Sequence, residues 1–126
     1  MLLPPTLFGK WTLFISAVSL FNTVQTYLGQ LELSRKVYSA QPQQVTALSN
    51  RTFGTWTGAV ALIRFICAYN LEEPAVFRIL FVTYATALVH FGLEWTVFKT
   101  ARLGKGLAGP LIVASSSLVW MIMLSR

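Results

Sequence analysis

The segment VFRILFVTYATALVHFGLEWTVF, residues 76–98, decides the fold because it is long enough and apolar enough to cross a bilayer. A hydrocarbon core about 30 Å thick is spanned by roughly 20 residues of helix. Within lipid the backbone has no water to bond with, so each segment must satisfy its own hydrogen bonds. This run is therefore predicted to be a transmembrane helix.

Three further segments have the same character, at about 8–28, 52–69 and 107–124. The sequence thus predicts an all-α membrane protein, a bundle of four transmembrane helices, with residues 1–126 forming a single transmembrane domain. The one long connection, 29–51, is polar and is predicted to be a loop.

The composition supports this class. Hydrophobic residues make up 55% of the chain and charged residues 11%, whereas a soluble domain has about 25% charged residues. A net charge of +6 would suggest nucleic acid as the partner of a soluble protein. Here most basic residues lie between or beside the apolar segments, which indicates the lipid bilayer and argues against nucleic acid.

The distribution of basic residues also predicts an orientation. The 29–51 loop and the 99–106 connection together hold Arg35, Lys36, Arg51, Lys99, Arg102 and Lys105. The positive-inside rule therefore places both connections in the cytosol and both termini across the membrane.

Four ionisable residues lie inside the apolar segments: Arg64, Arg78, His90 and Glu94. Each costs about 2.5–3.5 kcal/mol at a helix centre, so each needs a partner or a function. His90 and Glu94 are four residues apart and share one helix face. Asn22 and Gln25 are the uncharged equivalents in the first segment.

The second segment carries a stripe of small and polar residues that includes Gly54, Gly58 and Arg64. A Gly-x-x-x-Gly pattern allows another backbone to approach closely. We expect this stripe to pack against the His90 face of the third segment, with Arg64 meeting Glu94 inside the bundle. Self-association through the two glycines is left open.

Three interpretations of His90 and Glu94 follow. They form a buried contact that holds helices in register, an acid–base pair of a membrane isomerase acting on sterols or lipids, or part of the polar cavity of a small transporter together with Arg64. A zinc site needs three or four ligands, and the chain has one histidine and one cysteine, so no metal is predicted. Without a dinucleotide-binding pattern, no cofactor is predicted either.

Several short runs carry a more specific signal. They are NTVQTY at 22–27, NRTFGTWT at 50–57, Ile63-Arg64 with Cys67-Ala68, and His90-Phe91 with Glu94. In order and spacing, along nearly the whole chain, these runs resemble the ergosterol biosynthetic protein 28 family. The candidate structural and interaction residues are Asn22, Thr23, Gln25, Arg51, Thr52, Phe53, Gly54, Trp56, Thr57, Gly58, Arg64, His90, Phe91 and Glu94.

The resemblance implies a multi-pass protein of the endoplasmic reticulum membrane that catalyses no reaction. Members of that family are scaffolds for the enzymes of sterol C4-demethylation in ergosterol biosynthesis. The implied partners are the sterol C4-methyl oxidase, the NAD-dependent decarboxylating dehydrogenase and the 3-keto-sterol reductase, in some cases with a sterol methyltransferase.

Overall fold

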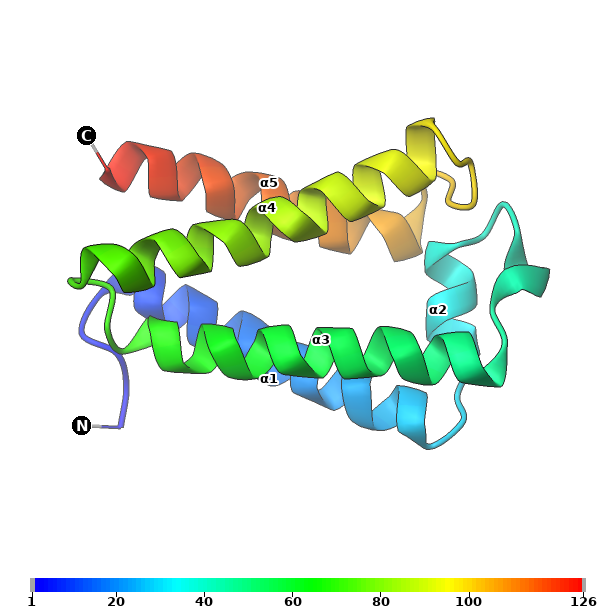
Figure 1. Ribbon diagram of the computed structural model, residues 1–126, viewed down its shortest axis with the longest axis horizontal. Coiled ribbons are helices and arrows are strands. Elements are labelled where there is room, and N and C mark those ends of the chain that lie inside the picture. The colour runs from blue at the N-terminus through cyan, green and yellow to red at the C-terminus, as the bar shows by residue number, and fades with distance from the viewer. Residues whose placement is uncertain (1, 126) are drawn as a thin grey trace.

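The computed structural model describes residues 2–125, which form five α-helices and one short 3₁₀ turn (Figure 1). The elements are α1 (Leu7–Tyr27), α2 (Glu32–Val37), the turn η1 (Pro42–Gln44), α3 (Ala47–Ala68), α4 (Pro74–Thr96) and α5 (Lys105–Leu124).

The four long helices form two antiparallel pairs. In Figure 1, α1 and α3 lie together in one layer, α4 and α5 lie in the other, and the short α2 stands across one end. Both chain ends lie at the opposite end, beside the tight turn between α3 and α4. The two basic connections are therefore at the same end of the molecule, and which side of the membrane that end faces stays a prediction.

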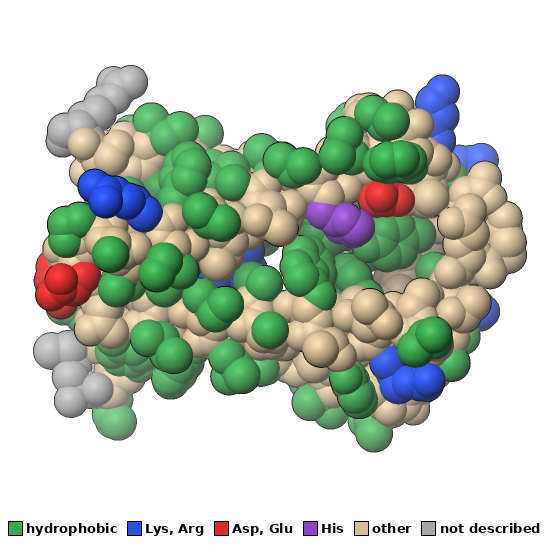
Figure 2. All heavy atoms as spheres, viewed as in Figure 1, with side chains coloured by type: hydrophobic (Ala, Val, Ile, Leu, Met, Phe, Trp, Pro, Cys, Tyr) green, Lys and Arg blue, Asp and Glu red, His purple; other side chains and the backbone are tan. Residues whose placement is uncertain are grey.

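The all-α membrane class is confirmed, but the count of four apolar spans is too high. Within the described residues, α1, α4 and α5 are long and apolar enough to cross a membrane. The fourth long helix, α3, has 22 residues but carries Asn50, Arg51 and Arg64 among several threonines. Figure 2 shows hydrophobic side chains over the middle of this face and most of the charged ones near its two ends, as a bilayer requires.

The α3 helix begins five residues before the expected Thr52, because Thr46 caps it. The Thr46 Oγ1 atom accepts from the Ser49 backbone N–H at 3.1 Å, while the Thr46 N–H donates to Ser49 Oγ at 2.9 Å. Such a reciprocal pair satisfies N–H groups that a helix start leaves free. The 29–51 segment is likewise not a plain loop, because it contains α2, η1 and the first turn of α3.

The glycine stripe of α3 packs on α1 and not, as expected, on α4. A Cβ atom at Gly54 would lie 1.9 Å from Thr26 Oγ1, and one at Gly58 would lie 3.1 Å from Thr23 Cγ2. The Thr23 hydroxyl also donates to the Gly54 carbonyl oxygen at 3.1 Å. Small residues thus bring two helices of the same chain together, and both glycines are buried by that contact.

The two helix pairs are held together most tightly near the chain ends. Trp11 Nε1 donates to Ser117 Oγ at 2.9 Å, and the Thr12 and Tyr84 hydroxyls lie 3.1 Å apart. Around these bonds lies a core of Phe8, Cys67, Leu80, Tyr84, Leu118 and Met121. A smaller core at the other end joins α2 to α4 and α5 through Val37, Phe91, Ala101 and Leu107.

Replacing Gly106 by alanine is expected to loosen the end of the molecule that α2 closes. The added Cβ would lie 2.3 Å from the Lys36 carbonyl oxygen, and a backbone atom cannot turn aside. Overpacking of this kind costs about 1–3 kcal/mol, which thermal unfolding in mild detergent will register. Gly109→Ala is the control, since a Cβ there meets nothing within 4 Å. Equal stability of the two variants would contradict this packing.

Candidate functional site

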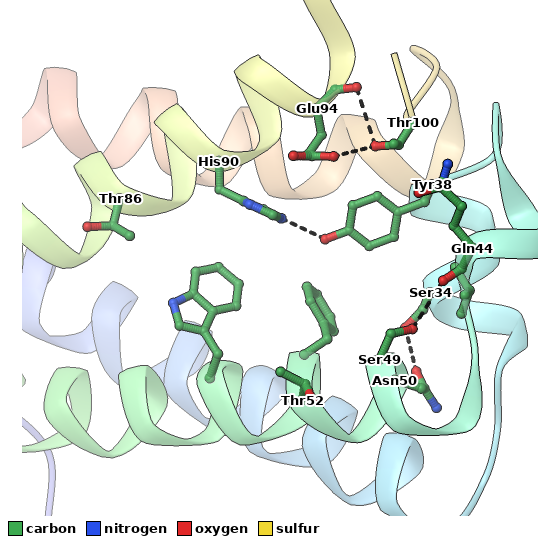
Figure 3. A pocket seen from close by; sticks show the side chains of 13 residues that line it. Ser34, Tyr38, Gln44, Ser49, Asn50, Thr52, Thr86, His90, Glu94 and Thr100 are labelled. Carbon is green, nitrogen blue, oxygen red and sulfur yellow. Dashed lines mark hydrogen bonds between the residues drawn. The ribbon is translucent and has the colours of Figure 1, made fainter. Parts of the chain in front are cut away.

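A cavity of about 440 Å³ lies where α2, α3 and α4 meet (Figure 3). This volume is within the range of small-molecule sites. Most of its lining residues are polar and the others are aromatic or aliphatic; they are Ser34, Tyr38, Gln44, Val45, Ser49, Asn50, Thr52, Phe53, Trp56, Thr86, His90, Glu94 and Thr100. The sequence-predicted pair of His90 and Glu94 thus lies in one cavity wall, on α4.

The nearest polar partner of His90 is Tyr38, which ends α2. Tyr38 Oη lies 2.7 Å from His90 Nε2, and Figure 3 shows the two side chains meeting across the cavity. Burial raises the pKa of Tyr38, and the Glu94 carboxylate raises it further, so the phenol stays protonated at neutral pH. The pair therefore joins α2 to α4 as a neutral hydroxyl beside an imidazole.

Aromatic rings surround this pair. The Trp56 ring centroid lies 5.5 Å from that of His90, and Phe53 packs edge-on against Tyr38 at 6.0 Å. Phe91 lies 6.4 Å from Phe53 and 6.3 Å from Trp56. Three residues of the candidate motif thus form one aromatic wall between α3 and α4.

Glu94 bonds to the connection that follows its own helix. Thr100 Oγ1 donates to Glu94 Oε1 at 2.6 Å, and the Thr100 and Ala101 N–H groups donate to the Glu94 carbonyl oxygen at 2.9 and 3.1 Å. Lys99, with a φ of 58°, makes the turn that brings these groups back. Glu94 therefore fixes the α4–α5 connection.

The expected contact between Arg64 and Glu94 is wrong. Arg64 Nε donates to Thr83 Oγ1 and Nη2 to the Thr83 carbonyl oxygen, both at 3.1 Å, and the guanidinium carbon lies 4.2 Å from the centre of the Tyr84 ring. Arg64 is near the α3–α4 turn, whereas Glu94 is near the far end of α4. In an antiparallel pair those positions lie at different depths.

Asn50 is the residue that sequence reasoning missed. It is fully buried; its Oδ1 accepts from Ser34 Oγ at 2.6 Å, and its Nδ2 donates to the carbonyl oxygens of Thr26 and Gln30 at 3.2 and 3.3 Å. One side chain thus ties the end of α1, the α1–α2 connection and α2 to α3. Its place in the NRTFGTWT run was the available signal.

The other candidate residues divide by exposure. Arg51, Thr52 and the span residue Arg78 are exposed, while Asn22 and Gln25 are half-buried on α1. Asn22 lines the cavity that holds Arg64, whereas Glu94 lines a different one.

The cavity offers a hydroxyl, an imidazole and a carboxylate, which can bind an alcohol or carbonyl oxygen or move a proton. Among residues 2–125 no three His, Cys, Asp or Glu side chains gather as metal ligands would.

Replacing Tyr38 by phenylalanine is expected to destabilise the protein by about 1 kcal/mol, because the His90 ring nitrogen loses its partner in a partly buried place. The matched control is Tyr69→Phe, which removes an exposed bond from Tyr69 Oη to the Leu2 carbonyl oxygen. The two variants are compared by their thermal midpoints in detergent. A larger loss for Tyr69→Phe would contradict the role given to Tyr38.

Comparison with known proteins gives a consistent result. The model of the family described as "Erg28 like protein" matches residues 8–119. The chain is 53% identical to ergosterol biosynthetic protein 28 of Saccharomyces cerevisiae, over 94% of this chain and 80% of the relative. Identity is 51% to the Candida albicans protein of that name, covering 95% and 88%, and 34% to the human homolog, covering 90% and 81%. No solved structure matches the chain significantly.

Proposed function

Because this chain belongs to the Erg28-like protein family, we propose that it serves sterol biosynthesis as a non-catalytic scaffold in the endoplasmic reticulum membrane. Its partners are the sterol C4-methyl oxidase, the decarboxylating dehydrogenase and the 3-keto-sterol reductase, with a sterol methyltransferase as a further candidate. The names of its relatives support a role in ergosterol biosynthesis, and the choice of partners follows from the family resemblance of the sequence.

The observation that carries the proposal is how the ionisable groups of the bundle are used. Arg64 bonds α3 to α4, His90 bonds α4 to α2, and Glu94 bonds the α4–α5 connection. Each of these groups thus makes a hydrogen bond that joins two parts of the fold. This is the pattern of a rigid platform.

The outer surface suits an assembly within and beside the bilayer. Large apolar side chains are exposed along the spanning helices, including Phe14 and Phe21 on α1 and Val82 on α4. Exposed charged side chains, among them Lys36 and Arg102, lie at the end that α2 closes. Holding successive enzymes on one platform raises the effective concentration of each intermediate for the next step.

The test is capture of the full-length chain from membranes in mild detergent, with a photo-crosslinking residue at exposed Gln43 beside α2 or at exposed Glu72 in the opposite turn. We expect the three C4-demethylation enzymes to be recovered, with crosslinks favouring position 43. Loss of the protein should raise 4-methyl and 4-carboxy sterol intermediates. Recovery of none of the enzymes, where all are expressed, would contradict the scaffold.

A second candidate is a membrane-embedded sterol or lipid isomerase, favoured by the cavity that holds His90 and Glu94 together. Such an enzyme would convert a sterol with no other protein present. The purified chain is therefore incubated alone with candidate sterols, beside His90→Gln. Turnover that this substitution abolishes would replace the scaffold with the enzyme.

A further inference from the structure

A second cavity, of about 280 Å³, lies between the helix pairs and is lined by all four long helices. Its wall is mostly apolar, with Val60, Val113 and Ala114 among its residues. Two lining residues are exposed on the outer surface, Val18 of α1, at 42%, and Gly109 of α5. The cavity wall therefore reaches the outer surface on both α1 and α5, the surface that faces the bilayer.

The charged group in this wall is Arg64, whose residue is only 7% exposed. Its guanidinium donates to the two oxygens of Thr83 and has further N–H donors beyond these. Among residues 2–125, none that lines the cavity or contacts the guanidinium is acidic. Arg64 is thus a buried cation facing an apolar space without an anion from the surrounding wall.

The position of Arg64 does not let its charge reach the nearer membrane surface. Side chains lean toward the N-terminus of their helix, and the nearer end of α3 is its C-terminus at Ala68. The bond to Thr83, in the middle of α4, agrees with that direction. The guanidinium therefore points into the span, where charge is costly unless it is paired.

An unpaired hydroxyl lies in the same wall. Thr57 Oγ1 is buried and has no hydrogen-bond partner within residues 2–125. Thr57 and Arg64 are seven residues apart on one face of α3, about 10 Å along the helix. Buried polar atoms are nearly always bonded, so an unpaired hydroxyl and a guanidinium with spare donors indicate a ligand with oxygen atoms.

We propose that this cavity binds a sterol that carries a carboxylate, with the carboxylate at Arg64 and a second oxygen near Thr57. An apolar body suits the wall, and a carboxylate accepts paired hydrogen bonds from a guanidinium. The volume is at the small end for ligand sites, so the cavity holds the oxygen-bearing end and the rest extends toward lipid. The choice of a sterol over other lipid acids rests on the proposed function.

The experiment measures saturable binding of radiolabelled cholesteryl hemisuccinate to the full-length protein in lipid vesicles, with unlabelled cholesterol and oleate as competitors. We expect unlabelled cholesteryl hemisuccinate to displace the label better than cholesterol or oleate does. Arg64→Gln should weaken binding roughly tenfold or more, while Arg78→Gln, at an exposed position of α4 outside the cavity, should leave it unchanged. Thr57→Val should weaken binding by a few fold.

Thr57→Val also serves if Arg64→Gln fails to fold. Without ligand its thermal midpoint should equal or exceed that of the wild type, because an unpaired buried hydroxyl is removed. With the ester, its midpoint should rise less than that of the wild type. An equal rise in both proteins would overturn the second contact.

Other outcomes decide the rest. Equal binding of the ester by Arg64→Gln and the wild type would contradict the role of the carboxylate, and so would equal competition by cholesterol and the ester. Stronger competition by oleate than by the ester would contradict the choice of a sterol. If the wild type captures the C4-demethylation enzymes but retains no ester, the cavity proposal fails and the scaffold stands. If the protein binds the ester but captures none of the enzymes, the cavity proposal stands and the scaffold proposal fails.

Discussion

Replacing Gly54 by alanine is expected to destabilise the bundle by about 2–3 kcal/mol, at the upper end of what overpacking costs. The new Cβ would lie 1.9 Å from Thr26 Oγ1 and 3.0 Å from Thr26 Cβ. Thr26 is itself buried, and its hydroxyl donates to the Thr23 carbonyl oxygen at 2.7 Å. Turning that side chain aside leaves the second close contact in place, so α1 and α3 must separate.

The matched control is Gly92→Ala in α4, where a Cβ meets nothing within 4 Å. Both proteins are unfolded in mild detergent, by heat or by added denaturing detergent, and their midpoints are compared with the wild type. Only Gly54→Ala should unfold earlier, and Thr26→Ala in the same chain should recover part of the loss. Equal midpoints for Gly54→Ala and Gly92→Ala would show that the α1–α3 contact is not as close as described.

Replacing Asn50 by leucine is expected to cost about 2–4 kcal/mol. Three hydrogen bonds are lost, two of them buried and the one to Gln30 partly buried, each contributing roughly 0.5–1.5 kcal/mol. The Ser34 hydroxyl and the Thr26 and Gln30 carbonyl oxygens lose their common partner. Because these groups belong to three different segments, the change should also free α2 from α3.

Asn70→Leu is the control, since the Asn70 side chain makes one bond within residues 2–125, from Nδ2 to the Ile66 carbonyl oxygen at the end of α3. Its loss should stay below about 1 kcal/mol. Besides the unfolding midpoint, limited proteolysis reports on residues 29–46, and that segment should be cut faster in Asn50→Leu only. Unchanged proteolysis together with an unchanged midpoint would contradict the role of Asn50.

Much of the architecture follows from hydropathy alone. The runs at 8–28, 76–98 and 107–124 fall within a few residues of α1, α4 and α5, because apolar segments of about 20 residues in lipid have little choice but a helix. The family resemblance was also correct, since it rests on residue order and spacing.

Which faces meet was not in the sequence pattern. Gly54 and Gly58 predict that another helix packs closely on α3, but the sequence pattern does not say which one. Only the structure shows that this helix is α1. The same holds for α2, a helix of six residues that is too short to show a pattern of its own. It is held by the bonds of Ser34 to Asn50 and of Tyr38, at its C-terminal end, to His90.

Which groups the charged residues bond to depends on how far along the bundle each residue lies. Arg64 and Glu94 have complementary charges, and the sequence by itself predicted that both lie in long helices of one bundle. The antiparallel packing of α3 on α4 places Arg64 beside Thr83 and Tyr84 and leaves Glu94 at the far end beside Thr100. The sequence thus determined a helical membrane protein and its family, and the tertiary structure decided every pairing, because a side chain can bond only to groups at its own depth and on its own face.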